Sequence, residues 1–172
     1  MARNIPIPPK RFHAAGAALL AACLMRPAVA AEWWFVPPPA AWRGQALTYV
    51  DKSSLQRRSR SSLVTARVWI VHRADQTSEH GTYRSERHSA SVECAAKSYG
   101  ASRIELLDAF GGRVYRQADE PPGMKPIEGD SLQDTLSQFL CSEGKKPPRS
   151  FPVFDPSRDV EPRFLQGDRE SR

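Results

Sequence analysis

Cysteine is scarce in this chain, with three among 172 residues, and the first of them, Cys23, lies in an apolar N-terminal segment. Only Cys94 and Cys141 lie beyond that segment. They are too far apart in the sequence to form the Cys-x-x-Cys motif that thiol-exchange enzymes use. An even number of cysteines in an exported chain instead predicts one structural disulfide in an oxidising compartment.

Long hydrophobic runs are also missing. The longest uncharged apolar run spans residues 14–25, which is short of the roughly 20 residues that a membrane-spanning helix needs. Basic residues precede this run, and the small-residue sequence Ala28-Val29-Ala30 follows it. This arrangement is typical of a secretory signal peptide and predicts that residues 1–30 are removed during export.

The same segment has a second interpretation, which the sequence leaves open. Leu20-Ala21-Ala22-Cys23 is similar to a bacterial lipobox, in which cleavage precedes a cysteine that is then acylated. Cleavage after Ala30 predicts a soluble protein of the periplasm or cell envelope. Acylation of Cys23 predicts a lipid anchor in the outer membrane, and only in that case does the chain meet a membrane.

The positive charge is small once the signal segment is left out. The full chain has 25 Lys and Arg against 19 Asp and Glu, a net charge of +6. Four of the basic residues (Arg3, Lys10, Arg11 and Arg26) and none of the acidic ones lie in residues 1–30, which leaves 21 − 19, or +2. We therefore do not expect the nucleic-acid-binding function that the sequence pI near 9.5 would otherwise indicate.

Motifs for catalysis and metal binding are lacking too. The sequence has no Gly-x-Ser-x-Gly elbow, no glycine-rich phosphate loop and no pair of carboxylates at a recognisable spacing. His72, His80 and His88 recur every eight residues, whereas metal ligands on one strand or helix are about two to four residues apart. The sequence predicts neither an enzyme nor a metal or cofactor site.

Strand patterns dominate the remainder of the chain. Polar residues 74–82 predict a loop, Gly111-Gly112 predicts a hairpin turn, and residues 51–54 predict a turn that opens a short helical turn. Alternation between residues 85 and 99 places Cys94 toward the core. The six predicted strands cover residues 33–36, 46–51, 63–73, 85–99, 104–109 and 113–116.

One amphipathic helix follows the strands. Leu132, Leu136, Phe139 and Leu140 recur at helical spacing, and Asp130 or Ser131 can cap the N-terminus. The sequence therefore predicts an α+β fold in which a single antiparallel sheet of about six strands is covered by this C-terminal helix. A Cys94–Cys141 disulfide would fasten the end of the helix to a central strand.

The sequence predicts a single folded domain between residues 33 and 141. Residues 142–172 are rich in proline and charge, which predicts a loose, disordered tail because such a segment buries little apolar surface. The alternative is that the apolar exceptions within it dock onto the domain or onto a partner; these are Phe151, Val153, Phe154, Phe164 and Leu165.

The best candidate contact surface in the sequence is a basic cluster. Arg57, Arg58 and Arg60 can meet an acidic partner, such as an anionic component of the envelope or matrix. The alternative is a solvated turn between strands. The four tryptophans are expected to pack in the core or at its rim, with Trp33 and Trp34 on opposite faces of a strand.

Several short segments of the chain follow one another in a characteristic order: Trp33-Trp34, Tyr49-Val50-Asp51, Ser54-Leu55, Val68 to Val71, Val92-Glu93-Cys94, Tyr99, Gly111-Gly112-Arg113-Val114 and Leu136 to Cys141. In this order they resemble the bacterial surface-adhesin protein E-like domain family. The resemblance covers most of residues 33–141 and implies a small antiparallel sheet, a C-terminal helix and one disulfide in an exported envelope protein. The family's namesake is a surface lipoprotein that binds host extracellular-matrix proteins.

Together these features predict a non-enzymatic, exported binding protein of the cell envelope. Adhesion to a host or matrix protein is one hypothesis. A periplasmic structural or assembly factor without an adhesive role is the alternative, and an exposed sheet edge would also allow a homodimer.

Overall fold

The computed structural model describes residues 30–58, 61–147 and 149–170. Residues 1–29 of the predicted signal peptide, which include Cys23, lie outside these ranges, and so does Arg60. Among the described residues, no helix is long and apolar enough to cross a membrane.

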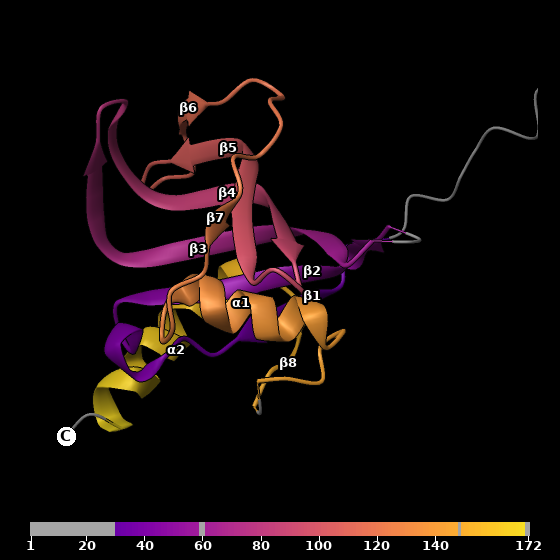
Figure 1. Ribbon diagram of the computed structural model, residues 1–172. Coiled ribbons are helices and arrows are strands. Elements are labelled where there is room, and N and C mark those ends of the chain that lie inside the picture. The colour runs from indigo at the N-terminus through magenta and orange to yellow at the C-terminus, as the bar shows by residue number, and fades with distance from the viewer. Residues whose placement is uncertain (1–29, 59–60, 148, 171–172) are drawn as a thin grey trace, which may run out of the picture.

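An antiparallel sheet of eight strands forms the body of the molecule (Figure 1). Its main path runs β6-β5-β4-β3-β2-β1-β8, and β7 pairs with β5. This confirms the predicted α+β class, although the sheet has two more strands than expected. The strands are β1 (Trp33–Val36), β2 (Ala46–Arg57), β3 (Leu63–Ser78), β4 (Gly81–Glu93), β5 (Ser98–Leu107), β6 (Arg113–Arg116), β7 (Lys125–Pro126) and β8 (Phe151–Val153), with a 3-10 helix η1 (Ala40–Trp42) between β1 and β2.

Two strand boundaries differ from the sequence prediction. The single strand expected over residues 85–99 is two strands, because the chain turns between Glu93 and Ser98. Lys97 makes this turn with a φ of 49°, a conformation that its side chain gives no reason to expect. Cys94 therefore lies in a turn rather than within a strand. The loop expected over residues 74–82 is the end of the long β3–β4 hairpin instead.

Helix α1 (Leu132–Cys141) covers one face of the sheet, as the sequence predicts (Figure 1). Its N-cap is Ser131, whose hydroxyl accepts a hydrogen bond of 3.0 Å from the backbone N–H of Asp134. Burying each Leu or Phe side chain stabilises the fold by about 1.5–3 kcal/mol. The side chains shared between α1 and the sheet include Val36, Val50, Val64, Val68, Val92, Leu136, Phe139 and Leu140.

The predicted disulfide joins this helix to the sheet. Cys94 follows β4 directly, and Cys141 is the last residue of α1. Their Cα atoms are 5.8 Å apart, and the bond closes a loop with a sequence separation of 47. The covalent link therefore fixes the C-terminal end of α1 against the end of the β4–β5 hairpin.

Residues 149–170 do not form the loose tail that the sequence favoured. β8 pairs with β1 and extends the sheet, and α2 (Pro156–Glu170) packs on the face opposite α1. The apolar residues Phe151, Val160 and Phe164 join a second core with Phe35 and Tyr49. Phe151 and Phe164 dock onto the domain, as the alternative interpretation expects, whereas Phe154 is fully exposed.

A polar contact also fastens α2 to the sheet. The Tyr49 hydroxyl donates a hydrogen bond of 3.0 Å to the Asp159 carboxylate, which also pairs with Arg163. Burial and the nearby Asp159 carboxylate raise the pKa of Tyr49. The Arg163 guanidinium lies 4.3 Å from the ring centroid of Phe35 and 4.4 Å from that of Phe151.

Loss of the disulfide should destabilise the protein strongly. Replacing Cys94 and Cys141 together with serine frees a loop of 47 residues in the unfolded chain, which is worth about 4 kcal/mol of unfolding free energy. Urea unfolding of the oxidised wild type and the double variant measures this loss. The reduced wild type serves as the control and should match the variant; equal stability of oxidised and reduced protein would contradict the prediction.

Candidate functional site

We call the sheet face that α1 covers face one and the face that carries α2 face two. The side chains of face two are aromatic near β8 and charged near β6. Directly paired residues on neighbouring antiparallel strands point to the same face. The pairing places one row of side chains across the whole sheet: Phe151, Phe35, Tyr49, Trp69, Arg87, Glu105 and Arg116. Helix α2 packs on the aromatic part of this row, whereas the charged part over β4 to β6 lines an open groove.

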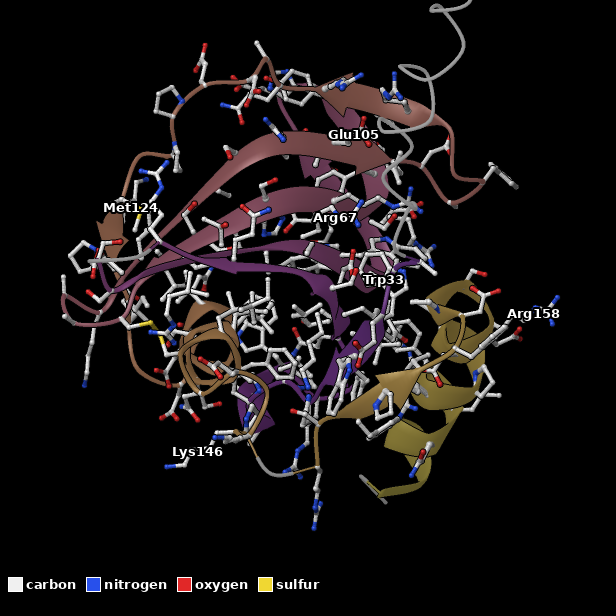
Figure 2. The ribbon with its side chains drawn as sticks, turned by 90° about the vertical axis from the view of Figure 1, so that its right-hand side faces the viewer. Trp33, Arg67, Glu105, Met124, Lys146 and Arg158 are labelled. Carbon is white, nitrogen blue, oxygen red and sulfur yellow. A yellow bond between two sulfur atoms is a disulfide. The ribbon has the colours of Figure 1, made fainter. Side chains whose placement is uncertain are left out.

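That groove has a volume of about 1080 Å³. Its walls include Pro156 and Ser157, at the start of α2, and residues 117–119, which follow β6. Figure 2 shows three of its residues, Trp33, Arg67 and Glu105, one above another across the strands, with α2 below them. The two helices therefore leave this half of face two open.

The rings of Trp33 and Trp69 form the floor of the groove nearest α2, and the buried Tyr49 ring packs beneath Trp69. The ring centroids of Trp33 and Trp69 are 6.3 Å apart in an edge-on contact, and those of Tyr49 and Trp69 are 5.9 Å apart. The Arg87 guanidinium lies 4.8 Å from the Trp69 ring centroid. Within the described ranges no carboxylate lies within ion-pair distance of Arg87, so the aromatic face holds this guanidinium in place.

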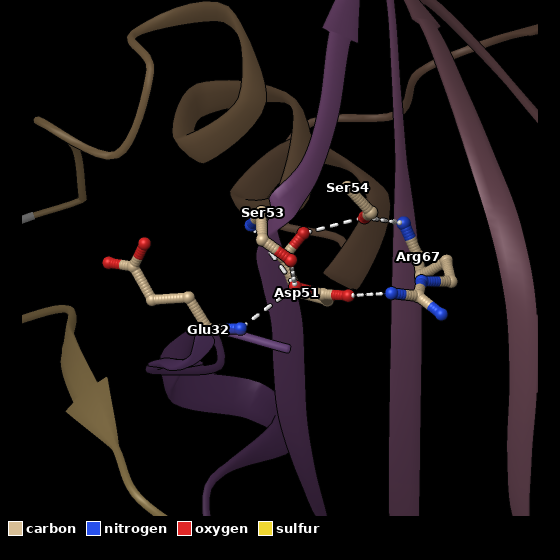
Figure 3. Close-up of polar contacts among 5 residues, drawn as sticks. All are labelled: Glu32, Asp51, Ser53, Ser54 and Arg67. Carbon is tan, nitrogen blue, oxygen red and sulfur yellow. Dashed lines mark hydrogen bonds and ion pairs between the residues drawn. The ribbon is translucent and has the colours of Figure 1, made fainter. Parts of the chain in front are cut away.

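A buried carboxylate holds the next arginine (Figure 3). Asp51 accepts hydrogen bonds from the backbone N–H groups of Glu32 and Ser53, both at 3.1 Å, and from the Ser53 hydroxyl at 2.6 Å. Its second oxygen accepts from the Arg67 guanidinium. The Ser54 hydroxyl accepts from the backbone N–H of Arg67 at 2.8 Å, which ties the two strands together.

These contacts replace the short helical turn that the sequence predicts after Asp51. β2 instead continues to Arg57 with a β-bulge between Asp51 and Gln56, because the Asp51 and Ser54 side chains satisfy the polar groups that the bulge leaves unpaired. The side chain of Asp51 is 0% exposed, whereas that of Arg67 is 60% exposed. The negative charge is thus buried beneath a guanidinium that reaches solvent.

Glu105 repeats this arrangement on β5. Its carboxylate lies 3.4 Å from the Arg113 guanidinium and 3.6 Å from that of Arg116. The Glu105 side chain is 24% exposed, and that of Arg116 is 64% exposed. Again the carboxylate lies below and the arginines face outward.

The fourth groove arginine depends on an irregularity in β5. The pairing of β4 with β5 shifts between Arg87 and Ser89, and Arg103 adopts a φ of 54° at this bulge. A bulge redirects a side chain relative to the regular alternation, and Arg103 lines the groove. Its guanidinium donates to both oxygens of Asp119, at 2.8 and 2.7 Å, and this pairing raises the pKa of Arg103 and lowers that of Asp119.

The groove is suited to binding an anionic group. Each of four neighbouring strands, β3 to β6, contributes an arginine, namely Arg67, Arg87, Arg103 and Arg116. Arginine offers planar, bidentate donors that match carboxylates and other oxyanions. Within the described part of the chain, no three His, Cys, Asp or Glu residues lie close enough together to hold a metal ion.

The arginines that the sequence singled out lie elsewhere. Arg57 ends β2, donates to the Cys141 carbonyl at 3.3 Å and lies 3.6 Å from Glu143. It thus caps the C-terminal end of α1, where a cation is favourable. Arg58 is exposed, and Arg60 lies outside the described ranges. The groove does not include Arg57 or Arg58.

Sequence reasoning missed all four groove arginines, Arg67, Arg87, Arg103 and Arg116, as site residues. The period-two pattern of a strand does place Arg67, Trp69 and Arg87 on strand faces that carry both apolar and polar side chains. A single arginine on such a face is, however, an ordinary surface residue. Only the register across strands brings them together. Nothing in the sequence signals the bulge that directs Arg103 into the groove.

A model of the surface-adhesin protein E family matches residues 40–142, more than half of the chain. The chain belongs to the surface-adhesin protein E family. This confirms the resemblance found in the sequence. The match begins at η1 and ends just after α1, so it includes both cysteines of the disulfide and all four groove arginines. β1, β8 and α2 of this adhesin-family protein lie outside the matched range.

Solved structures similar to this chain include protein E of Haemophilus influenzae, with 19% identity and a TM-score of 0.42 over 58% of this chain and 81% of that one. Its selenomethionine form has 17% identity and a TM-score of 0.45, covering 64% and 88% of the two chains. Protein E from non-typeable Haemophilus influenzae has 16% identity and a TM-score of 0.43, covering 63% and 75%. No curated protein matches in sequence.

Three of the four histidines of this adhesin-family protein lie in the described ranges, and each of these three contacts a different tyrosine. His80 stacks on Tyr115 with ring centroids 3.6 Å apart, and His72 meets Tyr83 edge-on at 5.7 Å. The His88 ring nitrogen Nε2 lies 2.6 Å from the hydroxyl oxygen of Tyr99. Burial lowers the pKa of His88 to about 4.

The buried His88 should make the protein less stable in acid. Unfolded histidine binds a proton near pH 6.5, whereas folded His88 binds it only near pH 4. The unfolded chain therefore holds more protons between these values, and unfolding free energy should fall by up to about 3 kcal/mol as pH drops through that window. Glu86, whose pKa burial raises, acts in the opposite direction.

A His88→Gln variant isolates the histidine, because glutamine can hydrogen-bond Tyr99 but does not titrate. Urea unfolding of both proteins across the window should show a steeper acid loss for the wild type. Parallel curves for the two proteins would contradict a role for His88.

Arg67 should matter for stability as well as for the groove. Arg67→Ala leaves the buried Asp51 carboxylate without its charged partner, which should cost about 2 kcal/mol of unfolding free energy. The exposed Arg58 provides the control, since Arg58→Ala should change stability by at most about 0.5 kcal/mol. Equal effects of the two substitutions in urea unfolding would contradict the role given to Asp51.

Proposed function

We propose that this chain is an exported, non-enzymatic protein of the cell envelope that binds a partner protein of the host or its matrix through the groove on face two. The observation that carries the proposal is the groove itself, in which exposed arginines are held over aromatic rings and buried carboxylates. Membership of the surface-adhesin protein E family supports an adhesin-like, envelope-associated role.

The composition of the groove favours protein binding. Arg and Trp are enriched among the residues that contribute most to protein interfaces. Side chains that are already held in place lose little conformational entropy when a partner binds. Arg87, which lies over Trp69, and Arg67, which Asp51 holds, both meet this condition.

Two further features support export. A disulfide such as Cys94–Cys141 forms and persists in oxidising compartments. The N-terminal sequence matches a secretory signal peptide, with acylation at Cys23 as the alternative to cleavage after Ala30. A periplasmic assembly factor would have the same two features, so partner identity and location have to separate the two functions.

Reversing one groove charge should weaken adhesion. Arg87→Glu introduces a carboxylate beside Trp69, and we expect it to lower binding to immobilised extracellular-matrix proteins by at least about tenfold, as for a central interface residue. Surface plasmon resonance with the purified mature protein measures the change. Arg58→Glu is the matched control: it makes the same charge change in the basic cluster found in the sequence, away from the groove.

The outcomes separate the possibilities. Loss of binding in the Arg58 variant alone would move the contact surface to the cluster of Arg57, Arg58 and Arg60. Absence of matrix binding by the wild type, with intact mass and cell fractionation placing an unacylated protein in the periplasm, would favour the assembly factor.

A further inference from the structure

We propose that the groove takes an extended acidic segment of the partner protein, and that Asp119 occupies part of this site in the free protein. The inference rests on the proposed function and adds the chemistry of the ligand. It depends on how the groove arginines are spaced, how they are held, and which side chain already occupies one of them.

The arginines repeat across the sheet. Arg67, Arg87, Arg103 and Arg116 come from four successive strands, and neighbouring strands lie about 4.8 Å apart. An extended peptide presents every second side chain on one face, at intervals of about 6.6 Å. The two spacings differ by about 1.8 Å, which the long, flexible arginine stems can bridge over two or three strands. Acidic residues at alternate positions of a peptide that crosses the strands can therefore meet several guanidiniums at once.

The guanidiniums also have unused donors. A guanidinium has five N–H groups, of which Asp51 takes one on Arg67, and Arg87 rests on a ring face instead. Because the carboxylates of Asp51 and Glu105 lie below their arginines, the positive groups face the open side of the groove. An approaching carboxylate meets these donors before it meets Asp51 or Glu105. The other two groove carboxylates are already bound, Asp119 by Arg103 and Asp155 by Ser157 and Arg158.

Arg103 shows that this placement has a structural cost. A positive φ is unfavourable for a residue with a side chain, yet Arg103 adopts 54° at the β5 bulge. Such outliers persist where the surrounding structure imposes them, and they concentrate at functional sites. The bulge directs this guanidinium into the groove, where it binds Asp119 through two hydrogen bonds.

In the free protein, the Asp119 carboxylate already binds a groove arginine in the way that we propose for the ligand. It belongs to the acidic pair Asp119-Glu120, in an irregular segment that forms one wall of the groove. Its side chain is 68% exposed and that of Arg103 is 65% exposed, and exposed ion pairs are weak and easily exchanged. A partner carboxylate that displaces Asp119 would form the same bidentate contact. The anionic groups that Arg67, Arg103 and Arg116 contact in the free protein are all carboxylates, so we assign an acidic polypeptide as the ligand and leave a sulfated glycan as an outcome of the test.

The test uses a fluorescent peptide of alternating glutamate and alanine, titrated with the purified mature protein at low and at physiological salt. We expect binding that weakens as salt rises. Asp119→Asn should strengthen it by about threefold, because the variant releases Arg103. Arg103→Gly should weaken it by at least about threefold while keeping the fold, since glycine suits the positive φ. Thermal unfolding confirms that each variant is folded.

A matched control comes from a second exposed ion pair. Arg84 and Asp75 lie 2.7 Å apart outside the groove, so Asp75→Asn frees an arginine without touching the site and should leave peptide binding unchanged. An equal gain from Asp75→Asn and Asp119→Asn would show non-specific charge attraction and overturn the proposal. Tighter binding of a heparin oligosaccharide than of the acidic peptide would overturn it in favour of a glycan.

The result is separable from the proposed function. If matrix-protein binding is lost in Arg87→Glu but the acidic peptide does not bind, the groove is the adhesive site and the inference about its ligand fails. If the peptide binds but matrix proteins do not, the ligand chemistry holds and the host-directed function fails.

Discussion

The buried carboxylate of Asp51 is the contact on which the groove depends. A charge without solvent exposure is costly unless hydrogen bonds compensate for the lost water. Two backbone N–H groups, one hydroxyl and the Arg67 guanidinium supply that compensation here. The same contacts set the bulge in β2, join β2 to β3 and hold an arginine toward solvent. Stability and the shape of the binding face are therefore coupled through one residue.

Different interactions stabilise the two faces of the sheet. Face one is a closed apolar core beneath α1, fixed by a disulfide and by side chains with almost no exposure. Face two changes from aromatic to charged along a single row of paired residues. Apolar burial alone would leave the charged half of this row unsupported. Ion pairs and the contact between Arg87 and Trp69 order it instead.

Sequence patterns were sufficient to predict the core on face one but not the groove on face two. Helical spacing of Leu132, Leu136 and Phe139 predicted α1, and the even cysteine number predicted its disulfide. The first signal lies within one short segment and the second concerns a covalent bond, so neither depends on the register of the strands. The groove needs the register of several strands, a bulge at Arg103 and the docking of α2, which depend on contacts between distant residues. Proline and charge in residues 142–172 concealed α2, because composition does not reveal that Phe151 and Phe164 find an aromatic face.

The covalent anchor at Cys141 has a consequence for the C-terminal part of the chain. The disulfide closes the loop from Cys94 to Cys141, while β8 and α2 follow this loop in the chain and lie beyond the segment that the family model matches. A different C-terminal attachment is compatible with the stapled scaffold only if it still covers the aromatic core around Phe35 and Tyr49. Because Pro156 and Ser157 at the start of α2 line the groove, relatives with the same scaffold and a different attachment would present a wider or narrower cleft.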